Sequence, residues 1–353
     1  MQATVADGIF MWSVWQADRN LFFNSFFVVD GGGNLAIDPL PLSEEDLAEI
    51  ERRGGLAWIA VTNRDHERDA RAIAKRFGAK IAASEADAAL LSGPVDRRLN
   101  DGEELAGARV IALEGLKTAG EIALLFRTQR TVVVGDALWG DPAGSVRLMP
   151  DGKLTDPARA ALSLRRLCSS RPAHLLVGDG ACIFGDAMRV IWDCLERRTD
   201  VYANKINIDE GVWYHDRPST PGLYQGSWLD VDPLIGAEKL GYLVARLPLG
   251  KAFCPVHWHA AEEELYYVLE GTPTLVTPRG NWRLRKGDLI SFPARAAGAH
   301  KLLNDGETPC EVLMIANTDP DDVCYYPDSH KLLVEKSRVL VRDNPILEYF
   351  DGE

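Results

Sequence analysis

The sequence has few of the features that mark small secreted, membrane or nucleic-acid-binding proteins. Six cysteines in 353 residues form no CxxC pair, so we expect neither a zinc knuckle nor a disulfide framework. No stretch reaches the roughly 20 apolar residues of a membrane span, and the N-terminus lacks the basic start of a signal peptide. Lys and Arg number 39 against 52 Asp and Glu, which argues against a general nucleic-acid surface. We therefore expect a cytoplasmic protein without membrane or nucleic-acid partners.

The chain length fits two domains, and the pattern changes along it. Residues 1–198 alternate strand and helix signals, as in an α/β domain. The predicted strands are 22–30, 34–37, 58–61, 80–83, 122–126 and 131–134, with another near residue 110. The predicted helices are 43–53, 67–77, 158–168 and 187–197. Polar residues 199–209 are predicted to link this domain to a second one, so the fold class is α+β with two domains.

Residues 210–353 show short β-rich runs separated by turn signals. The predicted strands are 240–247, 265–269, 274–276, 289–292 and 312–315. Gly271, Asn304-Asp305-Gly306 and similar turn residues lie between them. Regularly spaced short strands predict an antiparallel sandwich or barrel.

Three of the seven histidines gather in this second half, beside a run of three glutamates. His257 and His259 are two residues apart, so on a strand both imidazoles face the same side. Glu264 precedes an apolar strand, and His300 follows a turn-rich loop. Three imidazoles and one carboxylate suit a divalent first-row metal and leave coordination positions open. A regular strand would turn Cys254 away from His257.

This stretch resembles the cupin superfamily over about residues 210 to 335. The first cupin motif is matched by Gly250, His257, His259, Glu264 and Gly271, and the second by Gly287, Pro293, Gly298, His300 and Asn304. Both departures are loop lengths, before His257 and before His300. The spacing to Gly271 selects Glu264 from Glu262, Glu263 and Glu264. The resemblance implies a double-stranded β-helix (jelly roll), one divalent ion (Mn, Fe, Ni, Co or Zn) and a homodimer.

The first half resembles the metallo-β-lactamase superfamily, with an αβ/βα sandwich as the implied fold. The family's T-H-x-H-x-D-H motif appears here as Thr62-Asn63-Arg64-Asp65-His66-Glu67-Arg68. Lys117 replaces a later histidine, Asp136 keeps the Gly-Asp position, and Asp179 stands within the last Gly-x-Gly. The scaffold signals remain, whereas the metal-binding imidazoles do not.

A zinc hydrolase needs neutral nitrogen donors and a metal-bound water of lowered pKa. Lys117 and Arg68 would place positive charge where a dication should bind. We therefore expect no zinc hydrolase activity and place His66 on the surface. One alternative is a hard cation such as magnesium, held by Asp65, Glu67, Asp136 and Asp179. The other is that these acids pair with Lys117, Arg64 and Arg68.

Three functions fit this pattern. The first is a metal-dependent cupin enzyme that oxidises, isomerises or decarboxylates a small polar, sugar- or acid-like molecule. The second is a binding or sensor protein in which the metal holds a small ligand without turnover. The third is a structural role for the metal. Further polar groups converging beside the metal would favour the enzyme.

Overall fold

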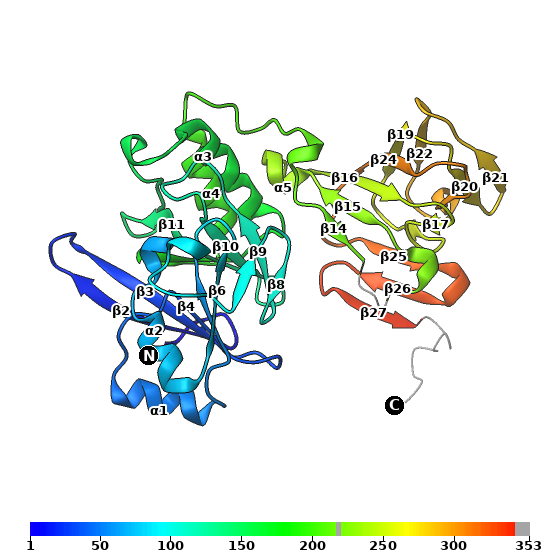
Figure 1. Cartoon of the computed structure of the whole chain (residues 1–353). Coiled ribbons are helices and arrows are strands. Elements are labelled where there is room, and N and C mark those ends of the chain that lie inside the picture. Colours follow the sequence, from blue (N-terminus) through cyan, green and yellow to red (C-terminus); the bar gives the residue numbers. More distant parts are fainter. Residues whose placement is uncertain (217–219, 343–353) are drawn as a thin grey trace. The chain divides into compact units, whose positions relative to one another are not determined.

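The computed structural model describes residues 1–216 and 220–342, and it divides the chain into two compact units. Unit 1 comprises Met1–Lys205 and unit 2 Ile206–Glu353, so the division lies within residues 199–209. Among the described residues, no helix is long and apolar enough to cross a membrane. Each unit is considered by itself below (Figure 1).

Unit 1 is built on one 13-stranded sheet with four α-helices. Its strands are β1 (Gln2–Ala3), β2 (Ile9–Gln16), β3 (Leu21–Val28), β4 (Leu35–Ile37), β5 (Trp58–Val61), β6 (Lys80–Ser84), β7 (Arg97–Leu99), β8 (Glu104–Leu105), β9 (Ala108–Ala112), β10 (Ile122–Phe126), β11 (Thr131–Gly140), β12 (His174–Gly180) and β13 (Ile183–Phe184). Its helices are α1 (Glu44–Arg52), α2 (Ala70–Phe77), α3 (Pro157–Leu164) and α4 (Ala187–Glu196). The central strand order is β7-β6-β5-β4-β3-β12-β11-β10-β9-β8.

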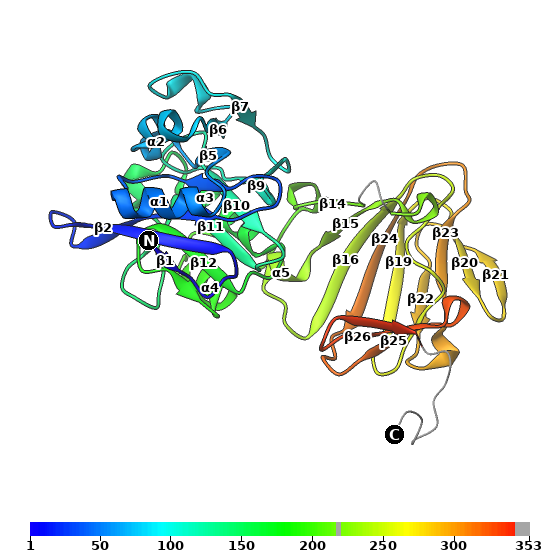
Figure 2. The same ribbon diagram turned by 90° about the horizontal axis from the view of Figure 1, so that it is seen from below.

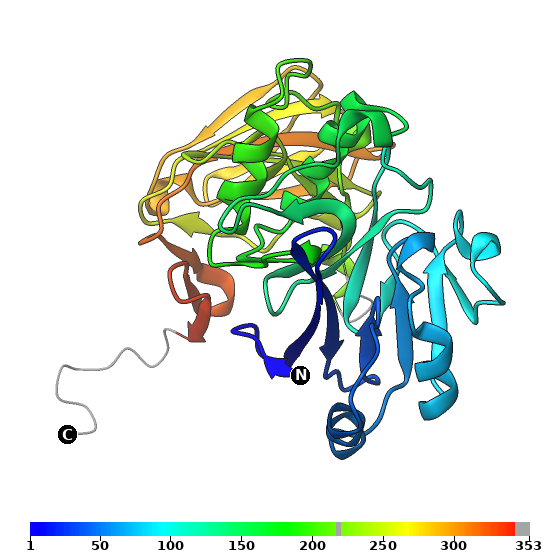
Figure 3. The same cartoon turned by 90° about the vertical axis from the view of Figure 1, so that its left-hand side faces the viewer.

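This unit has four layers: helices α1 and α2, the two halves of the sheet, and helices α3 and α4. Phe26 and Leu124 belong to a core built from both halves of the sheet. Their neighbours face the other way, because successive side chains of a strand point to opposite faces. Phe27 packs with α1 and α2, and Leu125 packs with α3 and α4. Figures 1 and 3 show the blue and the green helices on opposite sides of these strands. The predicted αβ/βα sandwich is confirmed.

Local sequence explains where these helices begin and end. Ser43 caps α1, and its hydroxyl accepts a hydrogen bond from the Asp46 N–H at 3.2 Å. Gly78, at φ 68°, ends α2 in the left-handed conformation. Helix α2 begins later than predicted, at Ala70, because Arg68 adopts a positive φ of 40° that an α-helix does not contain, and a separate 3-10 turn, Arg64–His66, precedes it. That turn carries the residues that resemble the hydrolase motif.

Unit 2 consists of three small sheets. The six-stranded sheet runs in the order β14 (Tyr214–His215), β15 (Ser227–Asp230), β16 (Leu240–Leu247), β24 (Cys310–Asn317), β19 (Glu264–Glu270) and β22 (Leu289–Phe292), as Figure 2 shows. A four-stranded sheet contains β17 (Lys251–Ala252), β23 (Lys301–Asn304), β20 (Thr274–Thr277) and β21 (Gly280–Arg283). The other contains β18 (Trp258–His259), β25 (Val323–Tyr326), β26 (Lys331–Val334) and β27 (Val339–Arg342). A short helix, α5 (Asp232–Ile235), precedes β16.

The core of unit 2 lies between the six-stranded sheet and the sheet of β17, β23, β20 and β21. It includes Tyr266 and Val268 from β19, Leu275 from β20 and Leu302 from β23. Gly271 ends β19 at φ 84°, where a Cβ would lie 2.6 Å from that of Cys310. Only glycine fits this turn without strain. The predicted jelly roll is confirmed.

Candidate metal centre

The four metal ligands predicted in unit 2 come from adjacent strand ends. His257 and His300 lie opposite each other in an isolated antiparallel bridge, with N···O distances of 3.0 and 2.9 Å. His259 ends β18, and Glu264 begins β19. The two-residue spacing therefore brings His257 and His259 to one side, as the sequence predicts.

One carboxylate oxygen faces all three imidazoles. Glu264 Oε2 lies 3.4 Å from Nε2 of His300, 3.7 Å from Nε2 of His257 and 3.8 Å from Nε2 of His259. His300 is fully buried and His257 nearly so. Glu262 instead accepts a hydrogen bond from the Asp319 N–H at 2.7 Å. The structure thus brings the four predicted residues together and sets Glu262 apart from their centre.

The outer nitrogen of each imidazole is held by an acceptor. Nδ1 of His257 lies 3.2 Å from the Pro255 carbonyl oxygen, and Nδ1 of His300 lies 2.9 Å from that of Gly298. Nδ1 of His259 lies 2.7 Å from Oδ2 of Asp322. Carbonyl oxygens only accept, so Nδ1 of His257 and His300 must carry the proton. In the neutral ring Nε2 then keeps its lone pair, as in metal-binding histidines.

This donor set fits a divalent ion. The Nε2 lone pairs of His257 and His300 converge on a carboxylate oxygen that Nε2 of His259 also faces, and the acceptors among them repel one another unless a cation or a proton lies between them. Donors about 2.1 Å from one metal are about 3.4 Å apart at a tetrahedral angle. The distances of 3.4 to 3.8 Å from Glu264 to the imidazoles are close to that spacing.

Burial keeps two of the imidazoles neutral. It lowers the pKa of His257 to about 4, and it lowers the pKa of His300 to about 3, with the neighbouring imidazoles adding to both effects. Burial also opposes charge on His259, but contacts with Cys324, Glu264 and Asp322 raise its pKa to about 10. Metal binding requires neutral imidazole, so His257 and His300 need no deprotonation.

A tyrosine hydroxyl joins this centre. Tyr266 Oη lies 3.0 Å from Nε2 of His300 and donates to Oε1 of Glu264 at 3.4 Å. The Phe292 ring stacks on His300 with centroids 3.6 Å apart, and it meets the Tyr266 ring edge-on. These rings fix the orientation of His300 and Tyr266.

Further residues of the centre could not be assigned from the sequence. Asp322 and Cys324 come from the region of β25, more than 60 residues after His259. No strand is predicted at 323–326, and only the pairing of β25 with β18 places these side chains. The expectation that Cys254 turns away from His257 is wrong, since Cys254 Sγ lies 3.3 Å from Nδ1 of His257. Residues 253–256 form no strand, so strand alternation does not apply there.

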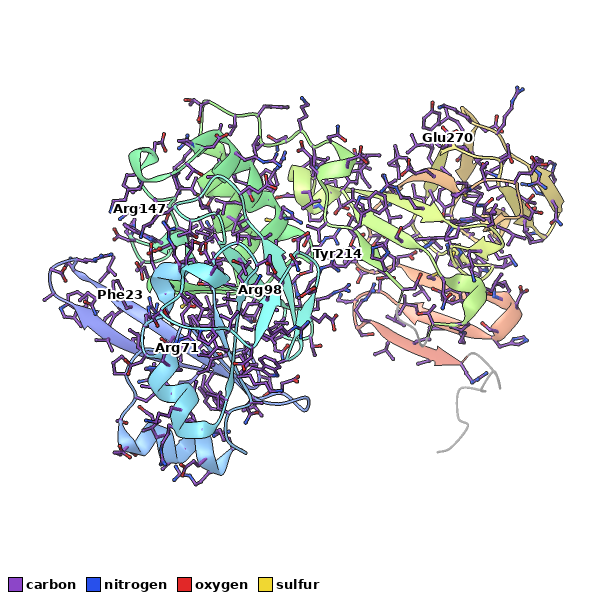
Figure 4. All side chains as sticks on the ribbon, viewed as in Figure 1. Phe23, Arg71, Arg98, Arg147, Tyr214 and Glu270 are labelled. Carbon is purple, nitrogen blue, oxygen red and sulfur yellow. The ribbon has the colours of Figure 1, made fainter. Side chains whose placement is uncertain are left out.

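Unit 1 contains a cleft of about 300 Å³ where the hydrolase motif resembles its family. Four of the five candidate residues line it: Asp65, Lys117, Asp136 and Asp179. Glu67, the fifth, is bound elsewhere. It accepts hydrogen bonds from Arg71 Nε at 2.6 Å and from the Ser92 N–H at 2.7 Å. Arg71 lies on α2 (Figure 4).

His66 lies at the centre of this cleft, so its predicted surface position is wrong. It is 4% exposed, with Nδ1 2.8 Å from Oδ2 of Asp38 and Nε2 3.5 Å from Oδ1 of Asp136. Burial alone would lower the pKa of His66, but the charge of Asp38 and the bond to Asp136 raise it to about 10. The 3-10 turn rotates this spacer residue inward, which the motif alone cannot show.

The cations of the protein balance the carboxylates of this cleft. Lys117 pairs with Asp65 and lies 3.8 Å from Asp136. Arg68 lies 3.5 Å from Asp179 and above the Phe23 ring, which Figure 4 labels. Across residues 1–216 and 220–342, the clusters of three close metal-donor side chains all lie in unit 2. The pairing of these acids with Lys117 and Arg68 matches one of the two alternatives drawn from the sequence.

Family models match both units. The model of the metallo-beta-lactamase superfamily matches residues 1–196, and the cupin domain model matches residues 243–316. The chain belongs to the metallo-beta-lactamase superfamily. This superfamily member carries a cupin domain in its C-terminal half.

Individual relatives cover parts of this superfamily member. It is 30% identical over 96 residues to the uncharacterized protein MJ1618 of Methanocaldococcus jannaschii, covering 26% of this chain and 69% of that protein. It is 32% identical over 160 residues to a hydroxyacylglutathione hydrolase of Acidiphilium cryptum, covering 43% of this chain but only 62% of that hydrolase. A cupin-superfamily sugar phosphate isomerase from Silicibacter pomeroyi is 23% identical, with a TM-score of 0.36, over 42% of this chain and 98% of its own.

The buried His66 makes the stability of unit 1 depend on pH. Its pKa rises from 6.5 to about 10 on folding, so its stabilising effect is complete below pH 6.5 and is lost as pH approaches 10. We expect His66→Gln to lower the free energy of unfolding by about 3–5 kcal/mol, because Asp38 and Asp136 lose their buried partner.

Chemical denaturation of the full chain at several pH values measures this effect. The control is His174→Gln, since His174 is half-buried and its Nδ1 accepts a hydrogen bond from the Gly185 N–H. Two results would contradict the ion-pair account. One is an equal decrease in the free energy of unfolding for both variants, and the other is a decrease for His66→Gln that is the same at pH 6 and pH 10.

Asp322 is predicted to hold His259 in its metal-binding orientation. Asp322→Asn should weaken divalent metal binding by about 10–100-fold, the usual effect of removing such a partner. Asp321→Asn is the matched control, because Asp321 pairs with Lys336 at the surface. Isothermal titration with Zn²⁺ compares the variants, and equal affinities of Asp322→Asn and wild type would refute the role of Asp322.

Proposed function

We propose that the protein is a metal-dependent cupin enzyme acting on a small polar molecule of sugar or acid type. One divalent ion (Mn, Fe, Ni, Co or Zn) would be held by His257, His259, Glu264 and His300. The reaction would be an oxidation, an isomerisation or a decarboxylation. The observation that carries the proposal is the convergence of three imidazole Nε2 atoms within 3.4 to 3.8 Å of Glu264 Oε2.

Four protein ligands would leave coordination positions of the ion open to a substrate. Protein ligands of this number leave one or two positions of a first-row ion open to water or a small oxygen-bearing molecule. When bound, such an ion supplies a Lewis acid, or a template that brings oxygen and substrate together. The buried rings of His257 and His300 exclude water from one side of the centre.

Tyr266 favours an enzyme over a sensor. Its hydroxyl lies beside two proposed ligands, His300 and Glu264, and its ring is 2% exposed. A hydroxyl at this position can hold or transfer a proton at a bound substrate, whereas a binding protein needs no such group. The Phe292 ring packs against Tyr266 and keeps the hydroxyl directed at the centre.

We further propose that unit 1 is not a zinc hydrolase. Its cleft carboxylates already face His66, Lys117 and Arg68. A dication entering there would be repelled by these cations. The cleft would thus be a charged remnant of a metal site.

Metal-free full-length protein, reloaded with each candidate ion, tests both proposals. We expect about one ion per chain, and almost none in a His257→Ala/His259→Ala variant, because two of four ligands are gone. The loaded wild type should turn over a member of a panel of hydroxy acids and sugars, followed by oxygen uptake, product isomers and released CO₂. Tyr266→Phe should keep the metal and lose turnover, and Asp321→Asn should keep both.

Other outcomes of this experiment would contradict the proposal for the cupin unit or the proposal for unit 1. Protein that binds no metal after reloading overturns the metal-dependent function. Bound metal with ligand-induced thermal stabilisation but no turnover identifies a binding or sensor protein instead. Two ions per chain, or hydrolysis of a lactone, thioester or β-lactam by the His257→Ala/His259→Ala variant, refutes the proposal for unit 1.

A further inference from the structure

The wall of the metal centre includes a strand outside the region matched by the cupin model. That region ends at residue 316, whereas β25 spans Val323–Tyr326. Strand β25 pairs antiparallel with β18, so that His259 lies opposite Cys324 and Trp258 lies opposite Tyr325. The residues after the matched region therefore contribute directly to the site.

Register determines which side chains of β25 face the metal centre. Trp258 and Tyr325 stack on one face of this strand pair, with centroids 4.1 Å apart and ring planes at 3°. Directly opposed residues share a face, and their neighbours share the other one. His259 and Cys324 therefore face the other side, where the metal centre lies.

The sulfur of Cys324 lies within reach of two proposed ligands. One ring nitrogen of His257, one of His259 and Sγ of Cys324 all lie within 4.8 Å of one another. Cys324 is 2% exposed. A nitrogen about 2.1 Å and a sulfur about 2.3 Å from one metal are about 3.6 Å apart at a tetrahedral angle, and about 4.4 Å apart when opposite. Donors of one ion thus span at most about 4.4 Å, so a shift of a few tenths of an ångström would let these three atoms share an ion.

We propose that Cys324 is a further ligand of the metal bound in the cupin unit. This inference rests on the proposed metal site. As the metal–sulfur bond forms, the thiol releases its proton to solvent, so the bound donor is a thiolate. A thiolate favours softer ions, so Zn, Co, Ni or Fe would be preferred to Mn.

Cys254 provides a matched comparison. Its Sγ lies 3.3 Å from Nδ1 of His257, the nitrogen that is turned away from Glu264. Cys254 can therefore contact the ring of His257 but lies behind it. A sulfur–metal signal should depend on Cys324 and be independent of Cys254.

Cobalt(II) loading of the full chain tests this inference by absorption spectroscopy. Thiolate bound to cobalt gives an intense near-ultraviolet charge-transfer band, which nitrogen and oxygen ligands do not. We expect the band in wild type and in Cys254→Ser, and its loss in Cys324→Ser. Cys324→Ser should still bind one cobalt through its three imidazoles and Glu264, and its preference for cobalt over manganese should fall.

X-ray absorption of the cobalt-loaded wild type gives a second measurement that needs no variant. We expect one sulfur scatterer at about 2.3 Å. Bound cobalt with no sulfur scatterer and no charge-transfer band refutes the Cys324 ligand and leaves the proposed function standing. A charge-transfer band that persists in Cys324→Ser also refutes the Cys324 ligand. Failure of the wild type to bind cobalt at all refutes the metal site itself.

Discussion

The C-terminal unit depends on one arrangement, in which the Nε2 atoms of three imidazoles face a single carboxylate oxygen of Glu264 at 3.4 to 3.8 Å. Such acceptors repel one another in a protein interior unless a positive charge lies between them. The strands around them fix the rings from outside, through Pro255, Gly298 and Asp322. Ring orientation and charge are thus both consistent with a cation at this point.

In the N-terminal unit, side chains of the protein supply positive charge to the carboxylates of the cleft. Asp136 lies between His66 and Lys117, and Asp179 faces Arg68. These side-chain cations are covalently part of the chain, which supports the proposal that no exchangeable ion binds there. Under the proposals above, the charge in unit 1 is balanced by side chains of the protein, whereas the centre in unit 2 is completed by a bound ion.

Local signals in the sequence predicted much of this structure, and long-range register explains the rest. Strands β5, β10, β16 and β22 have the predicted bounds, because short apolar runs end at clear turns. The spacing to Gly271 in the cupin motif selects Glu264, and in the structure Gly271 directly follows β19 at φ 84°. Asp322 and Cys324 could not be assigned, because their place depends on the pairing of β25 with β18. The surface position expected for His66 is wrong because a spacer position of the motif does not show the 3-10 turn in which this residue is buried.

The central claim is that the cupin unit holds the one metal ion of the chain. The most direct measurement is an anomalous difference map, collected at the metal absorption edge from crystals of metal-loaded full-length protein. The account predicts a single strong peak among His257, His259, Glu264 and His300. A peak beside His66 and Asp136, or no peak within the cupin unit, would contradict it.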